Sequence, residues 1–183
     1  MKNRKEGTLN VVMAPDTQTA SHQGLAGLTR SVHSLKERVD MIERSKWADE
    51  FSYEQMKTLA AYLDSYLVEQ GTMILHEGGH DAHMILIIQG QVNIVKEDAE
   101  RVQKVIATLG PGRTFGEMSL IDGEPRSASA VAATPVALLV LTKDSFIRLT
   151  QKAPHLALSL GLKIAKLVSQ RLRQTIGRLI DYI

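Results

Sequence analysis

Gly116, Glu117 and Arg126, all within the stretch 115–130, are residue types that together could bind a phosphorylated sugar. A helix that opens on Gly116 would direct several backbone N–H groups at one point, where an anion is favoured. Arg126 lies just beyond a Gly/Pro turn, and its planar, permanently charged guanidinium is suited to phosphate. Glu117 would repel a phosphate, so we expect it to accept hydrogen bonds from hydroxyl groups. The stretch therefore predicts a site for a sugar that carries a single phosphate charge.

The residues around these groups indicate a helix, a turn and a strand in succession. A short apolar run at 118–121 is compatible with one or two helical turns. It ends at residues 122–125, Asp-Gly-Glu-Pro, which favour a turn. A strand-like run follows over 127–131. We expect this single bend to bring Glu117 and Arg126 together.

Residues 66–142 alternate short apolar runs with turn residues, many of them glycine. Many short strands separated by such turns are typical of a β-sandwich or barrel, rather than of βαβ units. The runs that predict strands are Tyr66–Val68, Met73–Leu75, Met84–Ile88, Val92–Val95, Val102–Leu109, Ala128–Ala132 and Val136–Leu141.

The N-terminal region predicts a tail and two helices. Residues 1–20 show no sustained periodicity, which is typical of a flexible tail. Over residues 21–46, apolar side chains recur at the spacing of a heptad seam. They are Leu25, Leu28, Val32, Leu35, Val39 and Ile42. Such a helix would either lie on its own barrel or associate with another copy, and the pattern favours neither. A second helix is predicted to start at Ser52, which forms a capping-box pattern with Gln55.

The C-terminal region returns to a helical period. Residues 146–149 predict a short helix that Pro154 interrupts, and residues 155–183 predict one long helix. Its apolar positions are Leu160, Ile164, Leu167, Val168, Leu172, Ile176, Leu179 and Ile183, and the later ones again follow a heptad spacing. Lysine and arginine dominate its other faces.

The composition is that of a globular protein with no strong charge preference. A chain of 183 residues has room for one domain with extensions, and a net charge of +2 does not favour nucleic acid or an anionic membrane. The absence of cysteine excludes disulfides and thiolate metal sites, and it fits a cytoplasmic location. No apolar run is long enough to span a bilayer, and the N-terminus does not predict a signal peptide.

The stretch 115–127 resembles a phosphate-binding segment of a known family, called its cassette. Phe115-Gly116-Glu117, Leu120, Arg126 and Ser127 match the phosphate-binding cassette of cyclic nucleotide-binding domains, as in regulatory subunits of cAMP-dependent kinase and bacterial catabolite activator proteins. The resemblance implies that Glu117 holds the ribose 2′-hydroxyl and that Arg126 holds the exocyclic phosphate oxygens. The ligand-binding residues that it implies are Phe115, Gly116, Glu117, Met118, Ser119, Arg126 and Ser127.

The resemblance also implies an architecture. The expected fold is α+β, with an eight-stranded antiparallel jelly-roll β-barrel, flanking N-terminal helices and a long C-terminal helix. The chain would divide into a tail (1–20), a heptad helix (21–46), the nucleotide-binding barrel with its short leading helix (47–154) and a lid and dimerisation helix (155–183). In relatives, the last helix both covers the base of the nucleotide and pairs with its twin in a homodimer.

The implied function is a non-enzymatic cyclic nucleotide receptor that signals through its C-terminal helix to a partner protein or a twin subunit. The ligand would be cAMP or cGMP, and cAMP is favoured. Ser127 leaves both bases open, because a hydroxyl there can contact guanine but also occurs in bacterial relatives that bind cAMP. Base contacts are expected from the last helix, without a choice among its residues.

Other chemistries find little support. The glycines at 110–116 lack the ending of a phosphate loop, and Ser119 has no histidine partner within its motif, so we expect no enzyme. His76, His80 and His83 fall across a glycine turn, which favours solvated histidines over a metal site.

We expect no DNA partner, because the chain ends at Ile183 without the helix-turn-helix domain with which the activator relatives read DNA. Two alternatives stay open. One is a ligand-independent scaffold with the same fold, and the other is a transcription regulator without its DNA-binding domain.

Overall fold

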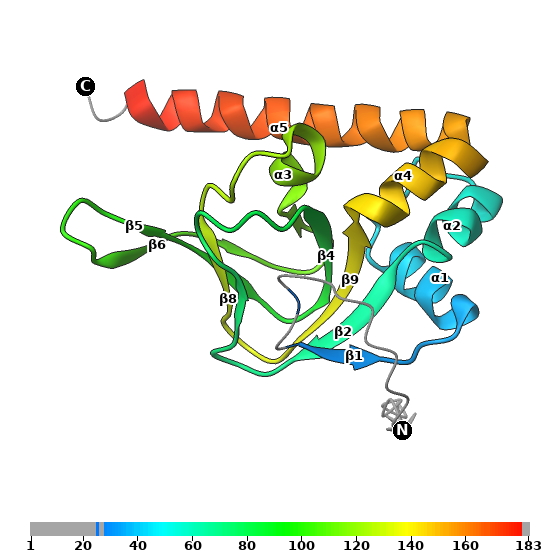
Figure 1. Cartoon of the computed structure of the whole chain (residues 1–183), viewed down its shortest axis with the longest axis horizontal. Helices are drawn as coiled ribbons and strands as arrows, with labels where there is room; N and C mark the ends of the chain where they lie inside the picture. Colours follow the sequence, from blue (N-terminus) through cyan, green and yellow to red (C-terminus); the bar gives the residue numbers. More distant parts are fainter. Residues whose placement is uncertain (1–24, 26–27, 181–183) are drawn as a thin grey trace, which may run out of the picture.

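The computed structural model describes residue 25 and residues 28–180, which form two antiparallel sheets with helices gathered on one side (Figure 1). One sheet has the strand order β1-β2-β9-β4-β7, and the other has the order β3-β8-β5-β6. The strands are β1 (Thr29–Ser31), β2 (Asp64–Val68), β3 (Met73–Leu75), β4 (His83–Gln89), β5 (Val92–Glu97), β6 (Gln103–Leu109), β7 (Thr114–Phe115), β8 (Ser129–Ala132) and β9 (Val136–Thr142).

The paired strands β4 and β9 separate two hydrophobic cores. Successive side chains of a strand point to opposite faces of its sheet. Accordingly, Ile85 and Ile87 of β4 pack between the two sheets, whereas Met84 and Leu86 pack under the helices. Residues 138–141 of β9 divide between the cores in the same way. Burial on both faces explains why these two strands read as continuous apolar runs rather than as an alternation.

The helices before the sheets begin at clear capping signals. They are α1 (Leu35–Arg44) and α2 (Tyr53–Ala60). Ser52 caps α2, and its side chain accepts a hydrogen bond from the Gln55 amide while the Gln55 side chain accepts one from the Ser52 amide. This capping box was expected from the sequence and is confirmed. Ser34 and Glu37 form a second capping box at α1.

The helix predicted over 21–46 is wrong for residues 28–34, and residues 21–24 and 26–27 lie outside the described residues. Residues 29–31 form strand β1, which pairs with β2, and the helix begins only at Leu35. Val32, an expected seam position, is 81% exposed, while Leu25 is buried in the core between the sheets. Backbone pairing with the neighbouring strand therefore prevails over the helical spacing of the side chains. The tail predicted for residues 1–20 lies outside the described residues.

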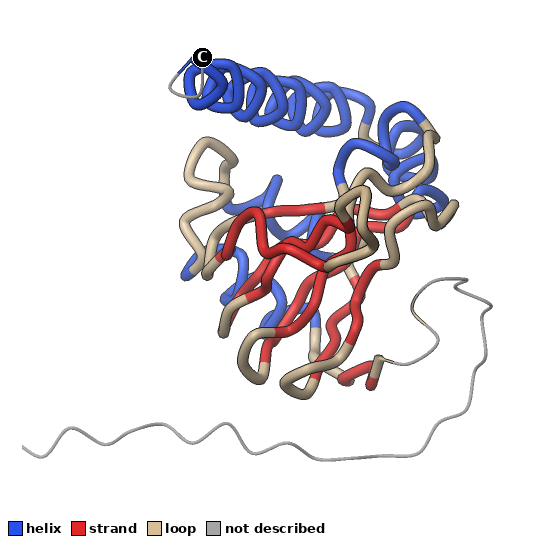
Figure 2. Tube along the Cα trace, turned by 90° about the vertical axis from the view of Figure 1, so that its left-hand side faces the viewer, coloured by secondary structure: helices blue, strands red, loops and turns tan. Residues whose placement is uncertain are grey.

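Three further helices follow within and after the strands. They are α3 (Glu117–Asp122), α4 (Lys143–Lys152) and α5 (Pro154–Ile180). The predicted interruption between a short and a long helix is present: α4 ends at Lys152, and Pro154 starts α5, because the first helical position needs no amide donor. Figure 1 shows α5 as a single long helix along one side of the sheets, and in Figure 2 it lies above the strands.

Helix α5 is held to the rest of the molecule through its N-terminal half. Leu160 and Ile164 are fully buried against α4 and the sheet, so these positions of the predicted seam face the core. Lys163 pairs with Glu50 and lies 5.1 Å from the centre of the Trp47 ring, a cation–π contact. By contrast, every described side chain from Leu172 to Gly177 is exposed.

The observed fold corrects the expected barrel in two respects. The described residues contain nine strands rather than the eight that the resemblance implies. Seven of them correspond to the apolar runs predicted as strands, and β1 and the two-residue β7 are additional. The strands form two separate sheets rather than a closed barrel. The α+β class, the antiparallel pairing and the long C-terminal helix agree with the prediction.

Candidate ligand-binding site

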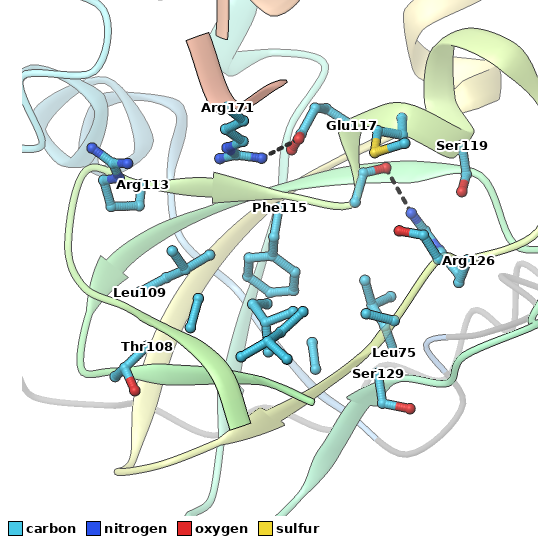
Figure 3. A pocket seen from close by; sticks show the side chains of 18 of the residues that line it. Leu75, Thr108, Leu109, Arg113, Phe115, Glu117, Ser119, Arg126, Ser129 and Arg171 are labelled. Carbon is cyan, nitrogen blue, oxygen red and sulfur yellow. Dashed lines mark hydrogen bonds and ion pairs between the residues drawn. The ribbon is translucent and has the colours of Figure 1, made fainter. Parts of the chain in front are cut away.

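A pocket of about 660 Å³ lies between the sheet β3-β8-β5-β6, helix α3 and the C-terminal half of α5 (Figure 3). Its volume is within the range of small-molecule sites. The side chains and backbone that line it belong to Leu75, Ile94, Ile106, Ala107, Thr108, Leu109, Arg113, Phe115, Gly116, Glu117, Met118, Ser119, Arg126, Ser127, Ala128, Ser129, Ala130, Arg171, Gln174 and Thr175. The pocket thus combines one apolar wall with a charged one.

The charged wall begins at Gly116, which has to be a glycine. Its φ of 76° lies in the left-handed region, and a Cβ there would lie 2.7 Å from Nη1 of Arg126 and 2.8 Å from the carbonyl oxygen of His83. From Gly116 the chain enters α3, whose first-turn amides have no intrahelical acceptor. A glycine therefore allows the backbone to turn closely around the Arg126 side chain.

Arg126 is buried, with 4% of its surface exposed, and its guanidinium is held by three hydrogen bonds. Nη1 donates to the carbonyl oxygen of Gly116 at 2.6 Å, and Nη2 donates to the carbonyl oxygen of His83 and to Asp81. A guanidinium has five N–H donors, so some remain. Among the described residues, the buried Nε has no partner. This arginine therefore keeps donor capacity for a further acceptor.

Burial lowers the pKa of the Arg126 guanidinium, and the carboxylates of Asp81 and Glu117 oppose that shift. Asp81 contacts Nη2 of Arg126 and Nε2 of His83, each at 3.3 Å. One carboxylate thus stabilises the buried charge from behind the pocket. Sequence reasoning did not identify Asp81, since the residue lies 45 positions from Arg126 along the chain.

The expectation of solvated turn histidines is wrong for His83. That side chain is 3% exposed and faces Asp81, whereas His76 and His80 are exposed. No cluster of three or more candidate metal ligands occurs among the residues that the structure describes.

Glu117 is the second buried charge, with 2% of its surface exposed. Its Oε1 accepts a hydrogen bond from Nη1 of Arg171 on α5, and Nη2 of the same arginine donates to the carbonyl oxygen of Thr114 (Figure 3). The other carboxylate oxygen, Oε2, is buried without a partner within the described part of the chain. Glu117 can therefore accept one more hydrogen bond, as a sugar hydroxyl would provide.

The pocket carries more positive than negative charge. Arg113, Arg126 and Arg171 line it, and Glu117 is the one carboxylate among its lining residues. Arg126 and Arg113 lie on opposite sides of Phe115 in Figure 3. A ligand with a single negative charge near Arg126 would complement this arrangement.

All seven residues that the sequence assigned to the site line this pocket. Phe115, Glu117, Ser119 and Arg126 are buried, while Met118 and Ser127 are exposed. Sequence reasoning did not identify the other lining residues, among them Arg113 and the three from α5, which are Arg171, Gln174 and Thr175. The expectation that α5 contributes to the base end gave no residue numbers, because only the packing of α5 fixes which of its faces meets the pocket.

Comparison with known proteins identifies this arrangement. Residues 67–153 match the family model described as "Cyclic nucleotide-binding domain". This chain contains a cyclic nucleotide-binding domain. The matched residues include the whole cassette and all strands from β3 to β9.

Two relatives with this kind of domain are similar to the chain in sequence. The chain is 34% identical over 121 residues to the cyclic AMP receptor protein of Thermus thermophilus, covering 66% of this chain and 54% of the relative. It is 38% identical over 98 residues to a cAMP-dependent protein kinase regulatory subunit of Yarrowia lipolytica, covering 54% of this chain and 25% of that protein. The chain therefore spans about half of the first relative and about a quarter of the second.

A crystal structure of a cyclic nucleotide-binding domain from Methylobacillus flagellatus resembles most of the chain. The TM-score is 0.80 at 28% identity, and the match covers 92% of this chain and 97% of the other. The matched family is one of cyclic nucleotide-binding domains, and the two relatives are a receptor protein and a kinase regulatory subunit. Over the described residues, no helix is long and apolar enough to cross a membrane.

Proposed function

We propose that this protein is a non-enzymatic cAMP receptor whose ligand acts on helix α5. The observation that carries the proposal is the buried Arg126, which has donor capacity left over at the edge of a pocket that Glu117 also lines. Arg126 would bind the exocyclic phosphate oxygens through a charge-assisted fork. The amides from Gly116 to Ser119 would complete the anion site, and Oε2 of Glu117 would accept from the ribose 2′-hydroxyl.

The base of the nucleotide would bind in the apolar part of the pocket. With the phosphate at Arg126 and the ribose at Glu117, the base extends toward Leu109, Ile106 and α5, which line the remainder. Phe115, Met118 and Ser127 also line the pocket and are proposed ligand contacts. The names of the receptor and kinase relatives support cAMP over cGMP.

The output would pass through α5 to a second copy of the chain. Leu158, Leu162, Leu172 and Ile176 are between 50% and 63% exposed, which is unusual for four large apolar side chains of one helix. Leu158 and Leu172 are two heptads apart, as are Leu162 and Ile176, so all four follow one seam. We propose that this seam forms a homodimer, and that an effector protein is a further partner.

Titration calorimetry with cAMP, cGMP and 5′-AMP tests the ligand. We expect cAMP to bind most tightly, cGMP more weakly, and 5′-AMP weakest, because its phosphate is not cyclised and carries an additional charge. Ligand at one hundred times its Kd should stabilise the fold by about 2.7 kcal/mol, which a thermal unfolding curve reports. Absence of heat and of thermal shift with every cyclic mononucleotide would instead support the ligand-independent scaffold.

A further inference from the structure

The backbone that follows Arg126 is held by a side chain rather than by strand pairing. The register between β5 and β8 extends only to Val95 and Ser129, so the ladder does not reach Ser127. Beyond it, Nζ of Lys96 donates a 2.8 Å hydrogen bond to the carbonyl oxygen of Ser127. A backbone carbonyl at the end of a ladder still needs a donor. Here the next residue of β5 supplies that donor through its side chain.

Glu77, in the turn after β3, holds Lys96 in this position. Its Oε1 accepts a hydrogen bond from Nζ of Lys96, and its Oε2 accepts one from the backbone amide of Glu97 at 3.3 Å. The hydrogen bond from Lys96 is the main reason that the pKa of Glu77 lies below its ordinary value. The backbone amide of Glu77 donates at 3.0 Å to the hydroxyl of Ser129, which lines the pocket. Glu77 therefore connects β5 with the segment that forms this side of the pocket.

The same turn also bonds to the backbone of Arg126. The amide of Gly78 donates to the carbonyl oxygen of Arg126, and the amide of Arg126 donates to the carbonyl oxygen of Gly79, both at 2.8 Å. Neither Lys96 nor Glu77 lines the pocket. Any effect of these two side chains on ligand binding must therefore pass through the segment that carries Arg126.

A carbonyl oxygen that is held in place also orients the amide of the next residue. The peptide bond between Ser127 and Ala128 is trans and planar, so its C=O and N–H groups point in opposite directions. Both residues line the pocket. The hydrogen bond from Lys96 thus restricts the rotation of a whole peptide group that adjoins Arg126.

We propose that Lys96 and Glu77 form a positioning pair for the phosphate end of the ligand site, and that the pair acts on the backbone of residues 126–128 without touching the ligand. The proposal rests on the proposed function and adds to it two residues from outside the pocket. A guanidinium on a backbone that is ordered before binding loses less freedom when the phosphate arrives, which favours affinity. Loss of the pair frees this backbone and weakens phosphate binding, while the pocket keeps all its lining residues.

The neighbouring strand offers a matched control for Lys96. Lys104 of β6 lies directly opposite Lys96 in the register of β5 and β6, and it also pairs with a carboxylate, that of Asp98 at 2.8 Å. It does not line the pocket. In titration calorimetry, we expect Lys96→Met to weaken cAMP binding about fivefold, the net contribution of an ordinary hydrogen bond. Lys104→Met should bind cAMP as the unchanged protein does. Equal affinities for the two variants would overturn the proposal.

A conservative variant and a double-mutant cycle distinguish positioning from a general loss of stability. Lys96→Arg still has donors for both partners and should recover most of the affinity. In an Arg126→Lys background, Lys96→Met should cost clearly less than fivefold, because a point charge depends less on orientation than a planar fork does. A general loss of stability would cost the same in both backgrounds, and that additive result would overturn the proposal. Thermal unfolding verifies that each variant is folded at the temperature of titration.

The carboxylate of the pair is tested by Glu77→Ala. This variant keeps the backbone amide that donates to Ser129 but removes the group that holds Lys96, so it should weaken cAMP binding by a similar factor. Full affinity in Glu77→Ala would exclude Glu77 from the pair. A protein that binds no cyclic mononucleotide would refute the proposed function, whereas normal cAMP binding in Lys96→Met would refute the positioning role alone.

Discussion

Nη1 of Arg126 donates a 2.6 Å hydrogen bond to the carbonyl oxygen of Gly116. The arginine after the turn at 122–125 is thus hydrogen-bonded to the glycine that precedes α3. Backbone hydrogen bonds between Arg126 and residues 78 and 79 fix the other side of the same residue. The guanidinium and the first-turn amides of α3 are therefore held relative to each other by the protein itself. A site of this kind does not need to be ordered by its ligand, which favours affinity.

Arg126 is expected to supply most of the phosphate affinity. Arg126→Ala should cost roughly 2–4 kcal/mol of cAMP binding, because the phosphate loses a charged fork. Arg126→Lys should cost less but noticeably, because a point charge replaces the fork. Titration calorimetry measures both, and Arg173→Ala serves as the control. Unchanged affinity in Arg126→Ala would remove the role assigned to this residue.

Asp81 does not line the pocket, yet its loss should weaken binding. Its carboxylate contacts both Arg126 and His83, so Asp81→Asn leaves the guanidinium less firmly positioned. We expect cAMP affinity to fall by about 1.5 kcal/mol, the value of a hydrogen bond to a charged group. Asp49→Asn, at an exposed position, should bind normally. Calorimetry that finds the two variants alike would show that Arg126 holds its place without Asp81.

Gly116→Ala should destabilise the fold and deform the site. Its positive φ alone costs about 1 kcal/mol for alanine, and the added Cβ would clash with Arg126 and His83. Gly71 has a similar φ of 82° but nothing within 4 Å, so Gly71→Ala isolates the backbone cost. Urea unfolding should therefore show a clearly larger loss for Gly116→Ala. Equal losses would mean that the neighbours yield without cost.

Alanine variants of two leucines of α5 should distinguish a side chain that stabilises the fold from one that is exposed in the proposed dimer seam. Leu160→Ala removes a fully buried side chain and should cost about 2–5 kcal/mol of stability. Leu162→Ala, at 63% exposure, should leave the free energy of unfolding of the monomer nearly unchanged. Urea unfolding at low protein concentration compares the two variants.

A charged substitution in the exposed seam of α5 tests whether that seam forms the proposed homodimer. Leu172→Glu would place a carboxylate in the middle of the proposed dimer interface, and desolvating it there is costly. We expect sedimentation velocity to show a dimer for the unchanged protein and a monomer for this variant, with Lys166→Glu as a control. A variant that sediments as a dimer would remove the seam from consideration.

The contiguous features of this protein could be predicted from its sequence, whereas contacts between distant segments could not. Ser52 and Gln55 lie three residues apart, and their capping box is present as expected. The cassette from Phe115 to Ser127 is equally local, and the structure places all of its predicted residues at one pocket. Local sequence determines such elements because the interacting groups are near neighbours along the chain.

Arg171 and Glu117 are 54 positions apart, and nothing in their local sequence connects them. Only the packing of Leu160 and Ile164 under α4 sets the rotation of α5 that directs Arg171 at the pocket. The same limitation explains the error at residues 29–33. There, the spacing of apolar residues fits a helix, but the free edge of β2 offers backbone pairing that the spacing cannot reveal.

The contacts of Lys163 with Glu50 and Trp47 fasten α5 near its N-terminal end, far from its C-terminal end. At 1.5 Å of rise per residue, Ile180 lies ~24 Å beyond Ile164 along the axis. If α5 moves as a rigid rod about this contact, a tilt of a few degrees displaces its C-terminal end by one or two ångströms. A partner protein that bound the C-terminal end of α5 would therefore meet the largest displacement of the helix.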